Sequence, residues 1–303
     1  MSKKISQIGE IGLIERISKV LKMDSSVIKG IGDDTAVIKY SKDKFLLFTC
    51  DMLIEDVHFL KKHNPKSIGH KALACNISDI ASMGGVPKYA VISLGLPRNL
   101  PLKYIDAIYR GISNLARRFN VNVVGGDTNR SDRIIIDVAL LGFVEKDNLV
   151  LRNGAKNRDF IFVSGALGGS IRGRHLKFLP RLSEARSLIK NFKVNSMIDL
   201  SDGLAQDLNR ITKESKVGAV IYEELVPVHR DAKSINEALY MGEDFELLFT
   251  LSPKEARLLL KHPFLKQTKV TYIGSILDKR FGTKIINRDC SIRNLKPEGF
   301  QHF

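Results

Sequence analysis

The sequence predicts an α/β (α+β) protein made of two domains. The chain has 303 residues, which exceeds the roughly 100–200 residues of a typical single domain. Apolar, strand-like runs alternate with segments in which apolar residues recur every three or four positions. A polar stretch with a central glycine, EKDNLVLRNGAKNR, interrupts this alternation. We therefore expect two domains, at residues 1–144 and 145–303.

The first half predicts alternating strands and helices. Strand-like runs are LLFT before Asp51, YAVISLGL, VNVV and RIIIDVALLGFV. Residues 67–83 predict a helix that Gly84 and Gly85 end. The clearest helix starts near Pro101 and has apolar residues at helical spacing, which are Leu102, Ile105, Ile108, Ile112, Leu115 and Phe119.

The second half repeats this alternation without a detectable sequence repeat. The strand-like runs are DFIFVSG, SMIDL, VGAVIY, FELLFT and TKVTYIGSI. A helix is expected after Ser201 and Asp202, with apolar residues at helical spacing. Ser252, Pro253 and Glu255 are typical of a helix start and precede ARLLLKH.

Composition indicates an ordinary globular protein of the cytoplasm. Hydrophobic residues make up 44% of the chain and charged residues 27%. No run of 18 apolar residues predicts a membrane-spanning helix, and the N-terminal segment has no apolar core of a secretion signal. Cys50, Cys75 and Cys290 are far apart and form no CxxC pair. This pattern indicates a reducing compartment and argues against a disulfide framework or a zinc site.

The net charge of +15 favours anionic partners. Lysine and arginine are spread along the chain, and the densest cluster is IRGRHLKFLPRL. No zinc-finger, RRM or helix-turn-helix signature accompanies that cluster. We therefore expect a solvated basic surface, with nucleic acid an unlikely partner. A non-catalytic nucleotide or nucleic-acid binder remains the alternative from a different functional class.

Aspartates in short, glycine-punctuated motifs are the most informative feature of the chain. They are Asp33, Asp34, Asp51, Asp79, Asp127, Asp199 and Asp202. Carboxylates repel one another unless a cation neutralises them, and Mg²⁺ is usually held by a few carboxylates together with substrate phosphates. The pattern predicts a phosphate-handling enzyme. Each aspartate alone could equally be a turn residue, a helix N-cap or a surface acid.

Several nucleotide and hydrolase motifs do not occur. The chain contains no GxxxxGK[ST] loop, no protein-kinase motif set, no GxSxG elbow and no HExxH helix. Gly30 and Gly32 lack the third glycine of a dinucleotide-binding fingerprint. If the protein uses ATP, it must bind it through a different architecture.

Six motifs in order resemble the thiamine-monophosphate kinase family. They are GIGDDTAV, TCDMLIEDVHF, KALACNISDIASMGG, GGDTNR, IDLSDGL and GEDFELLF. The family belongs to a superfamily with the aminoimidazole ribonucleotide synthetases. The resemblance implies a two-domain aminoimidazole ribonucleotide synthetase-like fold, with an N-terminal mixed-sheet domain that dimerises and binds ATP and Mg²⁺, and a C-terminal α/β domain. It also implies a homodimer that transfers the γ-phosphoryl group of ATP to thiamine monophosphate, giving thiamine diphosphate with the help of several Mg²⁺ ions.

The same resemblance implies roles for individual residues. The implied metal ligands are Asp34, Thr49, Cys50, Asp51, Asp79, Asp127, Asp199 and Asp202. The implied ATP contacts are Tyr109, Gly126, Asp127, Arg152 and Ser201, and the implied substrate contacts are His58, Glu243 and Phe300. Tyr109 also lies on the apolar stripe of its helix, so packing is a competing role. No catalytic base is implied, because phosphoryl transfer to an ionised phosphate needs positioning and charge neutralisation.

Three departures from the family pattern affect details. Cys50 stands where a hydroxyl residue is common; a thiolate suits Mg²⁺ poorly, so a backbone carbonyl ligand is expected. Residues 171–195 form a shorter segment than is usual. In LKPEGFQHF, Pro297 takes the place of an aromatic residue, and Phe300 is the candidate replacement. The runner-up function is another ATP-dependent synthetase of the same superfamily.

Overall fold

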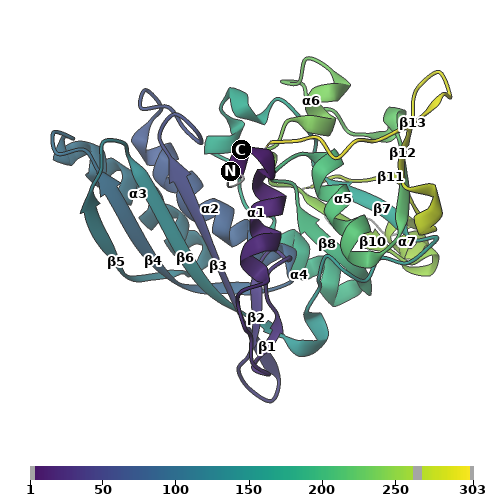
Figure 1. Ribbon diagram of the computed structural model, residues 1–303, viewed down its shortest axis with the longest axis horizontal. Helices are drawn as coiled ribbons and strands as arrows, with labels where there is room; N and C mark the ends of the chain where they lie inside the picture. Colours follow the sequence, from purple (N-terminus) through teal and green to yellow (C-terminus); the bar gives the residue numbers. More distant parts are fainter. Residues whose placement is uncertain (1–3, 262–267, 301–303) are drawn as a thin grey trace.

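The computed structural model describes residues 4–261 and 268–300, and these build two mixed sheets that lie beside each other (Figure 1). The first sheet has six strands in the order β1-β2-β3-β6-β4-β5. Their bounds are β1 Val27–Lys29, β2 Ala36–Lys39, β3 Lys44–Ile54, β4 Val86–Leu96, β5 Asn122–Arg130 and β6 Ile135–Glu145. Only the β4–β5 pair is parallel.

Two long helices, α2 (Pro65–Ser82) and α3 (Leu102–Phe119), cover the inner face of this sheet. Asn64 begins α2 by accepting a hydrogen bond from the backbone N–H of Lys66, and Pro65 occupies the first turn. Ile68, Leu73 and Ile77 of α2 are fully buried. Burying apolar side chains between helix and sheet is the main stabilising contribution to this half.

The second sheet has seven strands in the order β13-β12-β9-β11-β7-β10-β8. Their bounds are β7 Phe160–Ser164, β8 Val194–Asp199, β9 Gly218–Tyr222, β10 Leu247–Leu251, β11 Val270–Leu277, β12 Thr283–Ile286 and β13 Ile292–Asn294. Its helices are α4 Leu182–Asn191, α5 Leu204–Ser215, α6 Ile235–Tyr240 and α7 Pro253–Lys261. Separate apolar cores lie on the two faces of this sheet.

The two halves meet along α2, which packs against α4 and β8 of the second half. Arg186 of α4 donates hydrogen bonds to the carbonyl of Gly84 and to Glu145, both at 2.7 Å. The first helix, α1 (Gly9–Ser18), lies in front of the junction in Figure 1 and has no buried residue. No helix among the described residues is long and apolar enough to cross a membrane.

The predicted α/β two-domain fold class is confirmed, and every predicted strand and helix is present among the described residues; His262, the last residue of the predicted helix ARLLLKH, lies outside them. Two strands extend beyond the apolar runs that predicted them. Asp51 lies inside β3, not after it, and the Gly125-Gly126-Asp127 segment continues β5, because both stretches pair with neighbouring strands. The polar stretch after residue 144 contains a 3-10 turn, Lys146–Asn148, and the buried Val150. The boundary between residues 144 and 145 stays a prediction.

Helices α2 and α3 cross closely at Gly111. A Cβ atom at this position would lie 1.9 Å from the carbonyl oxygen of Lys66. We expect Gly111→Ala to destabilise the protein by about 1–3 kcal/mol through overpacking, although alanine is the better helix former. Thermal denaturation measures this. The exposed Ser113→Ala on the same helix is the control, and an unchanged melting temperature for Gly111→Ala would contradict the close crossing.

Candidate active site

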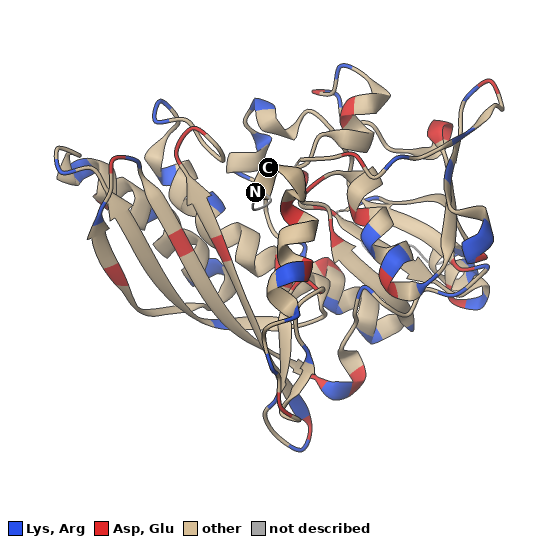
Figure 2. Cartoon of the chain, viewed as in Figure 1, with Lys and Arg blue, Asp and Glu red and all other residues tan. Residues whose placement is uncertain are grey.

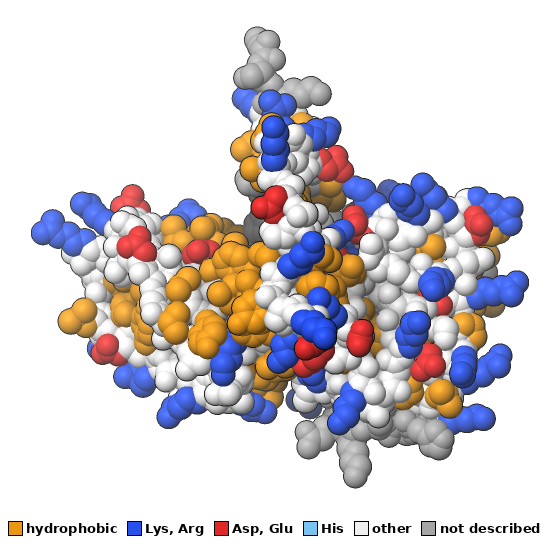
Figure 3. All heavy atoms as spheres, turned by 90° about the horizontal axis from the view of Figure 1, so that it is seen from below, with side chains coloured by type: hydrophobic (Ala, Val, Ile, Leu, Met, Phe, Trp, Pro, Cys, Tyr) orange, Lys and Arg blue, Asp and Glu red, His pale blue; other side chains and the backbone are white. Residues whose placement is uncertain are grey.

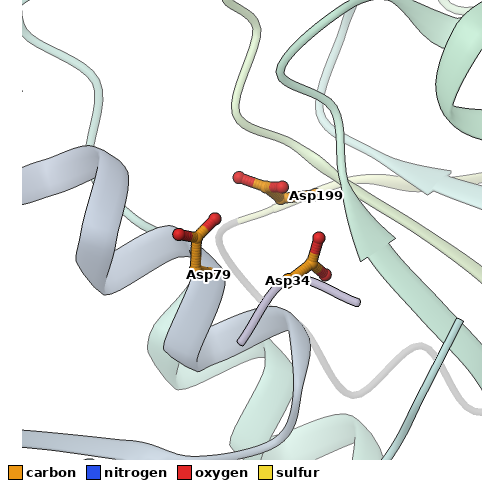
Figure 4. A group of neighbouring side chains, drawn as sticks. All are labelled: Asp34, Asp79 and Asp199. Carbon is orange, nitrogen blue, oxygen red and sulfur yellow. The ribbon is translucent and has the colours of Figure 1, made fainter. Parts of the chain in front are cut away.

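Three carboxylates from distant parts of the chain meet at the junction of the two halves. Asp34 lies in the loop between β1 and β2, Asp79 in the last turns of α2 and Asp199 at the end of β8. One oxygen from each lies within 4.8 Å of the others, and Figure 4 shows the three side chains facing a common space. The structure therefore brings together three of the predicted metal ligands.

A hydroxyl group donates a hydrogen bond to each of these carboxylates. Thr49 donates to Asp79 at 2.6 Å. Ser78 donates to Asp199 at 2.6 Å, and Ser82 donates to Asp34 at 2.5 Å. These bonds hold one oxygen of each carboxylate in place. Neither serine was among the predicted site residues, although two serines four residues apart on the helix that carries Asp79 indicate a shared polar face.

Asp51 lies next to this group, on the inner face of β3. Its Oδ2 atom is buried and has no hydrogen-bond partner among the described residues. Burial, and then the charges of Glu243 and Asp137, raise the pKa of Asp51 to about 6. An orphaned buried carboxylate oxygen is rare in native proteins and calls for an explanation such as a bound ion.

Burial and mutual repulsion also disfavour the ionised states of Asp79 and Asp199. Burial, followed by the charges of Asp51 and Asp199, raises the pKa of Asp79 well above its ordinary value. Burial and the charge of Asp34 have the same effect on the pKa of Asp199. A divalent cation would remove this penalty, and Mg²⁺ prefers oxygen ligands of this kind. The residues present therefore fit a magnesium site.

Arg152 is the basic residue that contacts this group directly. Its guanidinium donates to Asp34 Oδ1 at 3.1 and 2.5 Å. Its backbone N–H donates to both carboxylate oxygens of Asp33 at 3.2 Å. Burial and then the charge of Asp34 raise the pKa of Asp33 to about 7. Asp33 thus anchors the Arg152 segment to the Asp34 loop, and Arg152 lies beside the carboxylates, where it was predicted to contact ATP.

The loop after β8 contains the predicted residues Ser201 and Asp202 and links them to two others. Asp202 forms an ion pair with Arg210 of α5, and its carbonyl accepts a hydrogen bond from the backbone N–H of Phe300 at 3.1 Å. The carbonyl of Ser201 accepts from the N–H of Glu243 at 2.7 Å. This loop therefore joins the carboxylate group to the residues predicted to contact the substrate.

The three predicted substrate residues lie together on the other side of that loop. The rings of His58 and Phe300 are 6.3 Å apart between centroids. Lys71 of α2 connects His58 with Glu243: its Nζ donates to the His58 carbonyl at 3.0 Å and lies 2.5 Å from Glu243 Oε2. The sequence analysis did not single out Lys71, because a lysine within a helix is ordinarily a surface residue.

Four predicted residues do not join the carboxylates in this structure. The strand register aligns Asp127 of β5 with Ser93, Asp137 and Met52, on the outer sheet face opposite α2. Cys50 alternates with Asp51 and also faces outward. Gly126 packs against the carbonyl of Ile92, and Tyr109 of α3 is 38% exposed. Figure 2 shows an acidic position on β5 and another on β6, with β4 between these two strands.

Family models cover most of the chain. Residues 32–144 match "AIR synthase related protein, N-terminal domain", and residues 149–286 match "AIR synthase related protein, C-terminal domain". These matches, together with the two mixed sheets, confirm the predicted aminoimidazole ribonucleotide synthetase-like fold.

Similar curated proteins extend over nearly the full length. The thiamine-monophosphate kinase of Bacillus subtilis is 35% identical, covering 97% of this chain and 99% of that protein. The corresponding protein of Aquifex aeolicus is 35% identical, covering 99% and 100%. A solved structure described as "AaThiL complexed with AMPPCP and TMP" has a TM-score of 0.87 and 33% identity, with full coverage of both chains. Hydrogenase maturation protein HypE in complex with ATP, at a TM-score of 0.72 and 18% identity, is similar in fold alone.

Asp79→Asn tests the electrostatic strain in the carboxylate group. Because folding raises the pKa of Asp79, its ionisation opposes folding as the pH rises from the unfolded-state pKa to the folded-state pKa. At pH 8 with EDTA, we expect Asp79→Asn to melt no earlier than the parent protein. Adding Mg²⁺ should raise the melting temperature of the variant less than that of the parent. Asp147→Asn, at an exposed position, is the control; an unchanged Mg²⁺ response in Asp79→Asn would exclude Asp79 as a ligand.

Proposed function

The chain belongs to the thiamine-monophosphate kinase family, and we propose that it phosphorylates thiamine monophosphate to thiamine diphosphate with ATP. One observation carries the proposal: the family's aspartate motifs, dispersed from residue 34 to residue 199, converge on one space between the two halves. The related structure with AMPPCP, a non-hydrolysable ATP analogue, and TMP covers this whole chain.

We propose that the converging carboxylates hold several Mg²⁺ ions. Asp34, Asp51, Asp79 and Asp199 supply buried oxygens, and Thr49 and Asp202 stand at their edges. When bound, Mg²⁺ neutralises the charge of two polyanionic substrates and stabilises the transferring phosphoryl group. At Cys50 the backbone carbonyl is the proposed ligand, since the thiol faces the outer side of the sheet.

The surrounding side chains divide the site into a nucleotide end and an acceptor end. Arg152 and Ser201 lie at the proposed nucleotide end, where the guanidinium beside Asp34 is placed to bind phosphate oxygens. His58, Glu243 and Phe300 form the proposed acceptor end. The acceptor oxygen belongs to a phosphate that is already ionised near neutral pH, so these residues need only position it. Direct transfer between the two ends follows from this arrangement.

We propose that the outer face of the first sheet pairs with a second copy of the chain. Phe48 and Met52 of β3 and Tyr89 and Val91 of β4 are between 40 and 51% exposed on the face that no helix covers. Figure 3 shows hydrophobic side chains gathered over this half of the molecule. An exposed apolar patch of this kind is typical of a homodimer interface.

A dimer would also explain the position of Asp127. Its side chain faces the proposed interface, where Asn129 donates a hydrogen bond to it at 2.6 Å. We propose that Asp127 and the neighbouring Gly126 complete the site of the second copy. Tyr109, which makes no described contact with the carboxylates, stays a predicted ATP contact.

The alternative functions have less support. The similarity to HypE, at 18% identity, supports a shared fold and no shared activity. Another synthetase activity is therefore not favoured. In the densest basic cluster, Arg172, Arg174 and Arg181 form ion pairs with Glu237, Asp244 and Glu246. These arginines are therefore engaged within the chain and add little to a nucleic-acid surface. A cytoplasmic location stays a prediction from the unpaired cysteines.

The proposed activity predicts that the purified protein converts thiamine monophosphate to thiamine diphosphate in the presence of ATP and Mg²⁺. Little transfer to free thiamine is expected, because the acceptor end needs a phosphate. Chromatography of the products measures both reactions. Asp199→Asn should abolish turnover, whereas the exposed Asp147→Asn should not. The proposal would be refuted if the protein only hydrolysed ATP slowly and thiamine monophosphate did not change that rate.

The proposed dimer predicts complementation between two inactive variants. Asp79→Asn and Asp127→Asn should each abolish turnover. When the two are co-expressed in equal amounts, half of the dimers are mixed, and one site of each mixed dimer retains both aspartates; about a quarter of the parent activity should therefore return. No recovery in dimers shown to be mixed would mean that both aspartates serve one chain's own site, and a monomer in light scattering would remove the dimer itself.

A further inference from the structure

Lys71 is a charged residue at the centre of the junction between the two halves. It lies on α2 and is completely buried. Its ammonium contacts three acceptors: the His58 carbonyl at 3.0 Å, Nδ1 of His175 at 3.2 Å and Glu243 Oε2 at 2.5 Å. An ammonium has three N–H donors, which matches these three protein neighbours, so we assign Lys71 no direct contact with a substrate.

These contacts cross between the two halves of the molecule. Lys71 and His58 belong to the first half, whereas His175 and Glu243 belong to the second. Removing a lysine from water is unfavourable unless opposite charge and hydrogen bonds compensate. The position of Lys71 is therefore tied to that of the Glu243 carboxylate.

The segment that contains Glu243 needs such support. Glu243 has a φ of +70° and Phe245 a φ of +50°, a backbone region that costs non-glycine residues free energy. Each acidic residue of this segment has a basic partner: Asp244 pairs with Arg174 at 2.9 Å, and Glu246 with Arg181 at 2.5 Å. Both arginines, and His175, come from the basic cluster in residues 172–181. That cluster therefore holds the acidic segment in place.

Glu243 is kept in its ionised form. Burial opposes its ionisation, but the interaction with His175 and the charge of Lys71 outweigh burial and hold the pKa of Glu243 below its ordinary value. A carboxylate with a fixed position and a fixed charge is suited to bind the cationic or hydrogen-bonding part of an acceptor substrate.

We propose that Lys71 is a positioning residue for the acceptor end: it holds the Glu243 carboxylate and the His58 backbone in the relative position that binds the acceptor. This inference rests on the proposed function, because it takes thiamine monophosphate as the acceptor. Lys71 contacts neither Arg152 nor Asp34 among the described interactions, so its removal affects the acceptor end selectively.

Lys71→Met tests the inference, because methionine fills the same unbranched volume without charge. The expected result is a rise of roughly tenfold or more in the KM for thiamine monophosphate, in line with the loss of one charged hydrogen bond. The KM for ATP should change little. Calorimetric titration with thiamine monophosphate alone should show the same loss of affinity. Arg186→Met is the matched control, because it also removes an ion pair between the two halves and should leave both KM values unchanged.

A double-mutant cycle separates positioning from a general structural effect. If Lys71 acts through Glu243, then Glu243→Gln alone and the Lys71→Met/Glu243→Gln pair should have the same KM for thiamine monophosphate. The double variant also removes the unpaired buried charge that could unfold Lys71→Met, so the comparison stands even if the single variant is unstable. A much higher KM in the double variant would show that Lys71 acts independently of Glu243.

Two outcomes separate this inference from the proposed function. A parent protein that neither binds nor phosphorylates thiamine monophosphate would overturn both. A parent protein that does so, beside a folded Lys71→Met variant with an unchanged KM for thiamine monophosphate, would overturn the inference alone.

Discussion

Repulsion among buried carboxylates is the constraint on which the site depends. Asp34, Asp51, Asp79 and Asp199 converge in one space, and burial disfavours the charges of Asp51, Asp79 and Asp199. The protein orients Asp34, Asp79 and Asp199 with hydroxyl donors from α2 and β3, and among the described residues Arg152 is the cation that contacts them directly. The proposed Mg²⁺ ions would relieve the repulsion that the fold imposes on these carboxylates.

Helix α2 organises both ends of this site. Its last turns carry Asp79 with Ser78 and Ser82 toward the carboxylates, and its second turn carries Lys71 toward Glu243. Because one rigid helix holds both sets, helix geometry rather than flexible loops fixes the distance between the proposed nucleotide end and the proposed acceptor end. The dense packing of α2 against the sheet and α3 keeps that helix in place.

Much of the fold could be predicted from local pattern. The helix after Pro101 follows from its three- and four-residue apolar spacing, and the strands follow from apolar runs between glycines. The motifs also predicted the convergence of Asp34, Asp79 and Asp199. Other positions depended on strand pairing. For Asp51 a loop position was the alternative to a metal ligand, because the apolar run LLFT does not show that β3 continues to Ile54 beside β6. Lys71 looked like a surface residue, because its three acceptors lie at distant positions of the chain.

By itself, the sequence determined the fold class, the family and the kind of chemistry, because these depend on local periodicity and on residue types in ordered motifs. Only the tertiary structure decided which carboxylates share one space and which face away. Asp51 and Asp127 both lie in strands, yet the register sends Asp51 inward and Asp127 outward. Side chains alternate along a strand with a period of two, so a single step in register moves a residue to the opposite face. That step is set by pairing between strands far apart in the chain.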